Sequence, residues 1–392
     1  MTTPREDLDA RTAGPPHGAG SGRDGVRRRS RPELALVVEQ ILGHVTYGNN
    51  LSALLAANPR ANVSLLEVTM RTDGLTAHIP GLSNWTAQSA IDAARMIRRR
   101  NRVRPIDAML IHTQVPAVLN VRWMRRIPTV IGLDATPVQF DELGELYGHH
   151  TSPRPVERFK RWANVRCYRQ AAHVVAWSEW TKQSLMRDYG VAPEKITVMS
   201  GGVQVQRWRR VEGVPSPDQP LRILFVGADL DRKGGRLLLE AARMLRAEPD
   251  VPAFELHVVT GADIEAEPGV VAHGRFEPNS PELIELYHSS HIFCLPTFAD
   301  CLPMVLPEAA AAGLTLIATD VGAIREIVRP DDTGLLVPPR DLDALVAALR
   351  RALTEPELRA RLSRNAAALV SSDHDAAANA ERLIDVLLAV IR

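Results

Sequence analysis

Short apolar runs alternate with helical segments along nearly the whole chain, and this alternation restarts once. The first series of runs occupies residues 34–38, 63–68, 108–112, 129–133, 173–177 and 196–199. The second series occupies residues 221–227, 254–259, 291–295, 316–319 and 335–337. Such runs, separated by helices, are typical of parallel sheets that are buried on both faces. The pattern predicts two tandem, Rossmann-like, doubly wound α/β domains that bind ligands in a cleft at the carboxyl ends of their strands.

The segments between the apolar runs carry helical patterns. We expect helices at residues 87–100, 116–124, within 137–172, and at 235–246, 281–287, 306–312 and 342–353. Gly48-Asn49 is interpreted as a turn after the first strand, with the first helix starting at Leu51.

The chain has 392 residues, more than one hydrophobic core usually serves. A Pro-rich stretch at residues 213–220 separates the two series and is predicted to be the linker. The predicted domains are residues 31–212 and 221–373, and residues 374–392 are expected to form a helix that packs back on the first domain. Residues 1–30 lack periodicity and are interpreted as a disordered tail. No apolar stretch follows Arg27-Arg28-Arg29, so this tail does not resemble a secretory signal.

The cysteine content and the length of the apolar runs bear on cellular location. The chain has three cysteines, Cys167, Cys294 and Cys301, without metal-ligand spacing. So few cysteines favour a reducing compartment over a disulfide framework. No apolar run approaches the ~20 residues that a membrane helix needs. We therefore predict a cytoplasmic protein.

Charge is divided unevenly between the two halves. Residues 31–212 contain 24 basic and 15 acidic residues, whereas residues 213–392 contain 17 and 27. The first half is therefore a candidate for contact with an anionic partner, either the cytoplasmic membrane face or a phosphate-bearing acceptor. Solvated helix faces explain the same bias. Binding to nucleic acid is disfavoured because the acidic half would repel its backbone.

A basic loop follows the first strand of the second series. After Gly227 the chain reaches Arg232-Lys233-Gly234 and then enters a helix. Backbone amides and the positive end of a helix dipole favour a diphosphate there, and the two cations would balance charge on a leaving group. With only 4 Lys against 43 Arg in the chain, Lys233 stands out from the background. A surface charge patch is the alternative interpretation.

Two carboxylates, Asp300 and Glu308, flank the start of a later helix, with Pro307 in its first turn. Carboxylates accept hydrogen bonds from sugar and ribose hydroxyls, so the pair suits a polyhydroxylated ligand. Helix capping by Asp300 is the competing explanation, although it leaves Glu308 unexplained on an Ala-rich helix.

These residues resemble the signature of the family-four retaining glycosyltransferases, the group 1 glycosyl transferases of the GT-B fold. Asp300 and Glu308 match that family's acidic-x7-Glu motif, and Arg232-Lys233-Gly234 match its phosphate motif. Further similar segments are Trp177-Ser178-Glu179-Trp180, Tyr189-Gly190-Val191, Gly201-Gly202-Val203 and residues 319–337. The resemblance covers nearly everything after residue 34.

The resemblance implies a role for each matching residue. Arg232 and Lys233 would bind the donor diphosphate, Glu308 the nucleotide ribose and Asp300 the donor sugar. The other expected donor contacts are Gly48, Gly227, Leu302, Pro303, Met304 and Val305.

The first half supplies two candidates for the acceptor side. His112, at a strand end, resembles a family histidine that approaches the reacting sugar and joins Arg232, Lys233 and Asp300 as a catalytic candidate. A packed core histidine is the alternative. Asp134 ends the next strand, where helix capping explains it equally well.

The sequence departs from the family in three places. The family usually has Glu where this chain has Asp300, and many members carry a cation where this chain has Ala228. Gly48 also lacks the family's usual second glycine. These differences bear on the choice of donor.

The resemblance implies hexosyl transfer with retention from a UDP- or GDP-sugar to a hydroxyl of a glycan, a lipid-linked or a small-molecule acceptor. The leaving phosphate would act as base, and we expect neither a metal nor another cofactor, since cations and a helix dipole can stabilise the charge. Alternatives are an epimerase of the same fold and a non-catalytic nucleotide-sugar binding protein. A nicotinamide dehydrogenase is disfavoured because no Gly-x-Gly-x-x-Gly follows a strand.

Overall fold

The computed structural model describes residues 31–40, 44–56, 58–69, 85–144, 153–210 and 220–391. The predicted tail, residues 1–30, lies outside these residues, as does the predicted linker apart from Pro220. Residues from Pro32 onward group into one compact unit.

The first half of the described chain builds a parallel sheet in the order β2-β1-β3-β4-β5-β6. Its strands are β1 (Glu33–Gln40), β2 (Asn62–Thr69), β3 (Ala108–His112), β4 (Thr129–Leu133), β5 (His173–Ala176) and β6 (Ile196–Val198). The central strands β3 and β4 are buried at every residue, as expected for a sheet covered on both faces. Val38, His112 and Gly132 lie in register across β1, β3 and β4, so these strand ends share one edge.

The second half repeats this plan in the order β12-β11-β10-β7-β8-β9, again with parallel neighbours. Its strands are β7 (Leu221–Val226), β8 (Phe254–Val259), β9 (Val270–His273), β10 (Ile292–Leu295), β11 (Thr315–Thr319) and β12 (Gly334–Val337). Strand β9 was not predicted, because it is short and lies at the sheet edge without a fully buried residue. The two sheets confirm the predicted tandem α/β fold.

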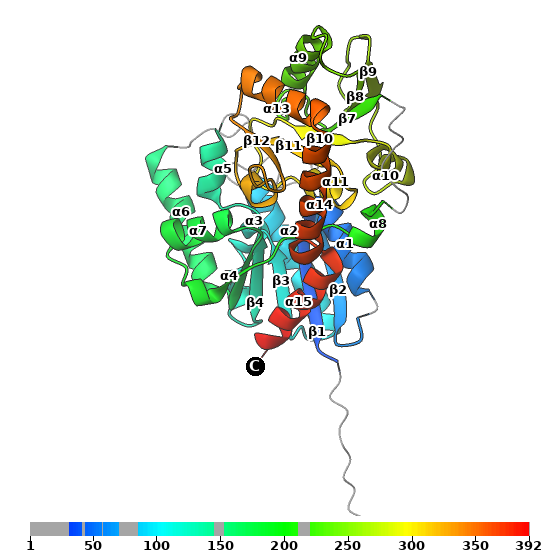
Figure 1. The fold of residues 1–392 in the computed structure, drawn as a ribbon. Coiled ribbons are helices and arrows are strands. Elements are labelled where there is room, and N and C mark those ends of the chain that lie inside the picture. The colour runs from blue at the N-terminus through cyan, green and yellow to red at the C-terminus, as the bar shows by residue number, and fades with distance from the viewer. Residues whose placement is uncertain are drawn as a thin grey trace, which may run out of the picture. The chain divides into compact units, whose positions relative to one another are not determined.

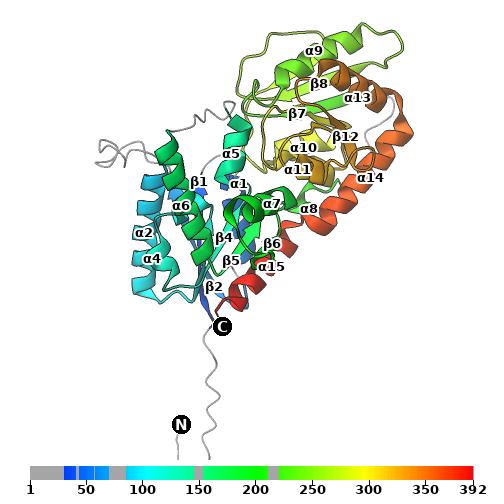
Figure 2. The same cartoon turned by 90° about the vertical axis from the view of Figure 1, so that its left-hand side faces the viewer.

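Helices cover both sheets, as Figures 1 and 2 show. Those of the first half are α1 (His44–Leu55), α2 (Trp85–Val103), α3 (Gln114–Ala117), α4 (Val121–Met124), α5 (Pro137–Leu143), α6 (Arg154–Gln170), α7 (Glu179–Tyr189) and α8 (Val205–Trp208). Those of the second half are α9 (Gly235–Arg246), α10 (Pro281–His288), α11 (Val305–Ala311), α12 (Ile324–Ile327), α13 (Leu342–Thr354), α14 (Pro356–Asp373) and α15 (Ala376–Ala389).

The last two helices lie on different sheets. Helix α14 packs on β11 and β12, whereas α15 packs on α1, β3 and β4, so the chain returns to the first sheet at its end (Figure 1). At the crossing, the Val203 amide donates to the His374 carbonyl at 2.8 Å, and the Ala376 amide donates to the Val203 carbonyl at 2.9 Å. Backbone hydrogen bonds therefore join the α14–α15 junction to the segment after β6.

The predicted turn at Gly48-Asn49 is wrong, because both residues lie inside α1. Tyr47, Leu51 and Leu55 stand at helical spacing and are all buried. Packing of this apolar face on the sheet outweighs the local turn preference of Gly and Asn. The expected helix at residues 116–124 is likewise divided into α3 and α4.

Candidate active site

The loop between β7 and α9 carries both predicted phosphate-binding cations. The Asp229 carboxylate accepts a hydrogen bond from the Arg232 amide at 3.0 Å, and the Asp229 carbonyl accepts one from the Lys233 amide at 3.0 Å. Gly234 then takes a left-handed φ of 75° and forms the N-cap of α9. This tight turn is why the cations stand directly before a helix N-terminus, where anions are favoured.

A second segment, after β10, is pressed against this loop. A Cβ at Gly234 would lie 1.9 Å from the carbonyl oxygen of Pro296, so no other residue fits there. The Phe298 amide donates to the Arg232 carbonyl at 2.8 Å, and Arg232 Nη1 donates to the Ala299 carbonyl at 2.8 Å. The two segments are therefore held together mainly by backbone atoms.

Lys233 and Asp300 meet across these segments. The Lys233 ammonium forms an ion pair with the Asp300 carboxylate, and the two side chains are only 15% and 10% exposed. The structure thus brings together two residues that lie 67 positions apart in sequence. Helix capping by Asp300 is wrong, because α11 starts at Val305 with Met304 as an N-cap that makes no side-chain bond.

A third segment, after β11, contacts the backbone of Asp300 and Cys301. Gly322 has a left-handed φ of 56°, and a Cβ there would lie 2.2 Å from the Asp300 carbonyl oxygen. The Ala323 amide also donates to the Cys301 carbonyl at 2.8 Å. Gly322 lies within the motif segment 319–337 but was not predicted to have a role, although a glycine is what a left-handed turn requires.

Glu308 lies in the first turn of α11 and is buried. Burial raises the pKa of its carboxyl group to about 8, and the Tyr287 hydroxyl donates to it at 3.4 Å. Burial raises the pKa of Tyr287 as well. A protonated Glu308 can donate as well as accept, which suits a ribose diol. Tyr287, a partner that the sequence did not reveal, comes from α10.

The remaining predicted donor residues lie around this centre. Gly227 directly follows β7, and a Cβ there would press on the side chains of Phe225 and Lys233. The segment from Leu302 to Val305 connects Asp300 to α11; Leu302 and Pro303 are buried, and Met304 and Val305 are half-buried. The predicted donor residues of the second half thus belong to adjoining segments of one sheet.

A hollow of about 440 Å³ opens at the carboxyl ends of β8 and β9. Its lining is formed by Thr260, Gly261, Ala262, Asp263, Ile264, Ala272, His273, Gly274 and Arg275. The ring nitrogens His257 Nδ1 and His273 Nε2 are 3.0 Å apart beside it. Because β8 is the neighbour of β7, the hollow shares a sheet edge with the Arg232–Lys233 loop. No sequence motif marks this hollow, because it is formed by two loops that carry none.

His112 ends β3 in a fully buried position. Its Nδ1 lies 3.0 Å from the Gly132 carbonyl oxygen, which places the proton of a neutral ring on Nδ1. The ring stacks on Trp177 at 5.1 Å and contacts Tyr47 at 4.7 Å between centroids. His112 is therefore oriented by β4 and by two aromatic side chains.

Asp134 and Gly48 lie near the same strand ends. Asp134 follows β4 and its carbonyl accepts a hydrogen bond from the Thr181 hydroxyl. Capping by Asp134 is wrong, because Thr136 caps α5 in a capping box with Gln139. A Cβ at Gly48, within α1, would lie 2.9 Å from Gln40 Nε2 at the end of β1.

No helix in the described part of the chain is long and apolar enough to cross a membrane. The described residues also contain no group of three or more His, Cys, Asp or Glu residues that could hold a metal ion.

Solved structures with this arrangement define the class of fold. The sucrose-phosphate synthase of Thermosynechococcus elongatus superposes with a TM-score of 0.71 at 18% identity, over 91% of this chain and 98% of that one. Anabaena Alr3699/HepE in complex with UDP-glucose superposes with a TM-score of 0.66 at 16% identity, over 91% and 99%. The chain therefore has the two-domain GT-B fold of glycosyltransferases.

Sequence comparison then identifies the family. The model "Glycosyltransferase Family 4" matches residues 55–207, and "Glycosyl transferases group 1" matches residues 206–369. Together the two matches show that the chain belongs to the family-four, group 1 glycosyltransferases.

Curated relatives match over part of their length. The MMP alpha-(1->4)-mannosyltransferase of Mycolicibacterium hassiacum is 31% identical over 51% of this chain and 50% of its own length. The D-inositol 3-phosphate glycosyltransferase of Rhodococcus opacus is 25% identical over 70% of this chain and 66% of its own length. The chain spans about half to two thirds of the length of these relatives.

Proposed function

We propose that this protein is a retaining glycosyltransferase that moves a hexosyl group from a UDP- or GDP-sugar to an acceptor hydroxyl. The observation that carries this proposal is the Lys233–Asp300 ion pair. It lies between loops whose close contact requires glycine at positions 234 and 322, and Glu308 follows Asp300 closely in the chain. Family membership supports it, as does the UDP-glucose complex of a protein with the same fold. The relatives named above are a mannosyltransferase and an inositol-phosphate glycosyltransferase.

In the proposed reaction, the donor diphosphate approaches Arg232 and Lys233, and the sugar hydroxyls approach Asp300. The acceptor oxygen bonds to the anomeric carbon on the face from which the diphosphate departs, so configuration is retained. The bond from that carbon to the diphosphate breaks, and the acceptor proton passes to a phosphate oxygen. The two cations stabilise the leaving charge, so the proposal requires neither a metal nor a resident cofactor.

The nucleoside part of the donor fits the hollow beside β8 and β9. This hollow lies on the same sheet edge as the Arg232–Lys233 loop and is lined by polar atoms of Thr260, Asp263 and Arg275. Its volume of about 440 Å³ is in the range of small-molecule sites. Glu308 would meet the ribose hydroxyls between base and diphosphate.

On the acceptor side, we propose that His112 and Asp134 approach the reacting sugar and the acceptor. The acceptor is a hydroxyl of a glycan, of a lipid-linked compound or of a small molecule. The basic first half favours an acceptor that is itself anionic or is held at an anionic surface. A cytoplasmic location is part of this proposal.

The outer face of α6 is the surface we propose for peripheral contact with an anionic membrane. Phe159 and Trp162 are 61% and 54% exposed and stack at 5.8 Å, and Arg166 lies over the Trp162 ring at 5.4 Å. Arg158 and Arg169 of α6 are exposed as well. Aromatic and cationic side chains on one helix face suit the interface of anionic lipid bilayers.

Vesicle sedimentation tests this contact. The protein should bind phosphatidylserine vesicles and not phosphatidylcholine vesicles, and Phe159→Ala with Trp162→Ala should weaken binding about tenfold. Met186→Ala, which removes an exposed apolar side chain from α7, should leave binding unchanged. Equal binding by all variants would refute the role of α6.

A thermal-shift screen with UDP-, GDP-, ADP- and dTDP-sugars tests the donor proposal. A bound donor raises the melting temperature with concentration, because it stabilises only the folded state. No response to any nucleotide sugar would contradict the donor site.

A non-catalytic nucleotide-sugar binding protein is the second candidate, favoured by the shorter Asp300 and its direct pairing with Lys233. It predicts a thermal shift without transfer or hydrolysis. Conversion of the donor sugar in the absence of any acceptor would instead indicate an epimerase.

A further inference from the structure

Glu326 of α12 makes a direct contact between elements of the two sheets. One of its carboxylate oxygens accepts a hydrogen bond from the Glu179 amide at 2.9 Å, and the other accepts one from the Trp180 amide at 2.8 Å. Helix α7, to which both amides belong, follows β5 of the first sheet, whereas α12 follows β11 of the second.

The two amides are ones that α7 cannot satisfy itself. The first-turn amides of a helix have no partner within it. The hydroxyl of Ser178, the N-cap, accepts from the Thr181 amide at 3.1 Å, which is a different amide of this first turn. Glu326 therefore completes the first turn of α7 from the other half of the molecule, with a negative charge at the positive end of the helix dipole.

On the second sheet, the start of α12 is bonded to the proposed donor site. Gly322 leaves no space for a Cβ beside the Asp300 carbonyl oxygen, and the Ala323 amide donates to the Cys301 carbonyl at 2.8 Å. Short backbone contacts therefore connect the start of α12 to the segment that carries Asp300.

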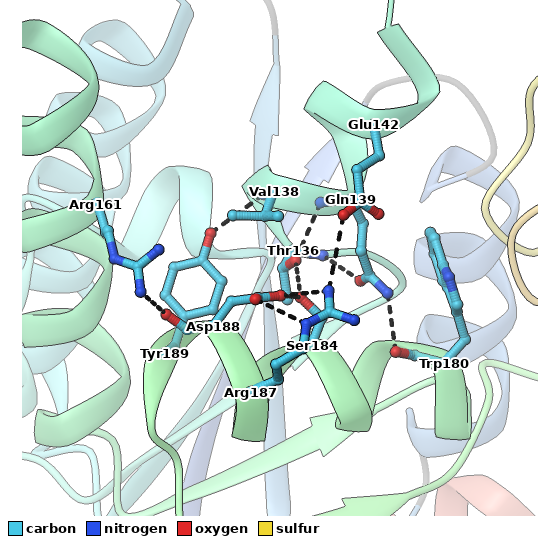
Figure 3. Close-up of polar contacts among 10 residues, drawn as sticks. All are labelled: Thr136, Val138, Gln139, Glu142, Arg161, Trp180, Ser184, Arg187, Asp188 and Tyr189. Atoms are coloured by element: carbon cyan, nitrogen blue, oxygen red, sulfur yellow. Dashed lines mark hydrogen bonds and ion pairs between the residues drawn. The ribbon is translucent and has the colours of Figure 1, made fainter. Parts of the chain in front are cut away.

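On the first sheet, the first turn of α7 is bonded to the segment after β4. The Trp180 carbonyl accepts a hydrogen bond from Gln139 Nε2 at 2.9 Å, and Gln139 belongs to the capping box of α5, as Figure 3 shows. The Thr181 hydroxyl donates to the Asp134 carbonyl. The Thr136 and Ser184 hydroxyls are 2.6 Å apart, which joins α5 to α7 once more (Figure 3).

We propose that Glu326 is a positioning residue. It would align the segment that carries Asp300 with the strand ends that carry His112 and Asp134. This inference rests on the proposed transferase function. Glu326 acts through α7 and the backbone at Asp300 rather than on a reacting atom. The proposed donor contacts other than Gly48 belong to the second sheet, so loss of Glu326 should affect the transfer step more than donor binding.

The test compares Glu326→Ala with Glu326→Gln, which keeps one amide oxygen as an acceptor. Donor affinity is measured by calorimetry and transfer by initial rates. Glu326→Ala should lower kcat about tenfold or more while donor affinity stays within about twofold, and Glu326→Gln should be intermediate. The matched control is Arg325→Ala, an exposed neighbour on α12 that pairs with Asp320 and should match the wild type.

Hydrogen exchange separates failure of this inference from failure of the proposed function. The amides of Glu179 and Trp180 should exchange faster in Glu326→Ala and Glu326→Gln than in the wild type, whether or not transfer is detected. Unchanged exchange at both amides would overturn the contact. Faster exchange with unchanged kcat, or an equal loss of donor affinity and kcat, would overturn the positioning role. The milder Glu326→Gln keeps the test valid if the alanine variant does not fold.

Discussion

The two sheets of this molecule form their candidate sites in different ways. In the second half, three segments contact one another through backbone atoms at Gly234 and Gly322, and the Lys233–Asp300 pair is enclosed between them. In the first half, His112 is placed by a strand end and by aromatic stacking, with Gly48 in a helix nearby. Backbone atoms leave no room for a Cβ at Gly234 or Gly322, whereas the side chain of Gln40 beside Gly48 can move to another rotamer. The second half should therefore tolerate substitution less than the first.

Alanine substitution at one glycine of each half gives the largest expected difference. Gly234→Ala forces a Cβ to 1.9 Å from a carbonyl oxygen at a left-handed φ, and should cost about 4 kcal/mol or more of unfolding free energy. Gly48→Ala meets the flexible Gln40 side chain and improves helix propensity, so its change should stay within about 1 kcal/mol. Urea denaturation measures both. Equal losses at the two positions would contradict the comparison.

Lys233→Ala tests the charge that the second half brings to the site. We expect kcat/KM for transfer to fall about 100-fold or more, because the leaving diphosphate loses a nearly buried cation. Arg236→Ala removes an exposed cation of α9 and is the control, expected to retain wild-type activity. The measurement is initial-rate kinetics with the donor identified by thermal shift. Unchanged turnover in Lys233→Ala would refute its phosphate role.

The buried Glu308 should make the free protein less stable as pH rises. Its pKa is about 8 in the folded state and 4.5 in the unfolded state. As pH rises, the unfolded chain therefore loses this proton at a lower pH than the folded protein does. Between pH 5.5 and 7, this group should lower the free energy of unfolding by about 2 kcal/mol. Glu308→Gln should lose that part of the pH dependence in chemical denaturation without ligand. A variant with the same slope as the wild type would show that the carboxyl group is ionised when folded.

His374, at the crossing between the two halves, should show the opposite and smaller pH effect. Burial lowers the pKa of its ring from 6.5 to about 4, so the unfolded chain takes up a proton first as pH falls. Lowering the pH from 6.5 to 5.5 should cost about 1 kcal/mol through this group. Denaturation curves of His374→Gln, in which this dependence disappears, provide the check. A wild-type pH dependence in that variant would assign the effect to other groups.

Local sequence pattern determined most of the fold. The predicted bounds of β3, β4, β8 and α9 agree with the structure, because short runs rich in apolar residues and an amphipathic repeat mark these elements directly. The motif residues of the second half could also be chosen from sequence, since a cation pair after a strand and two carboxylates around a helix start are local patterns.

Only the tertiary structure decided how these residues meet. Pairing of Lys233 with Asp300, rather than helix capping by Asp300, depends on neighbouring strands that are far apart in sequence. The helical state of Gly48 depends on burial of Tyr47 and Leu51 against the sheet, which local propensity does not contain. The contact of Glu326 with α7 joins residues 147 and 146 positions apart. Sequence determines which elements form because that information is local, whereas the free energy of long-range contacts decides which side chains lie together.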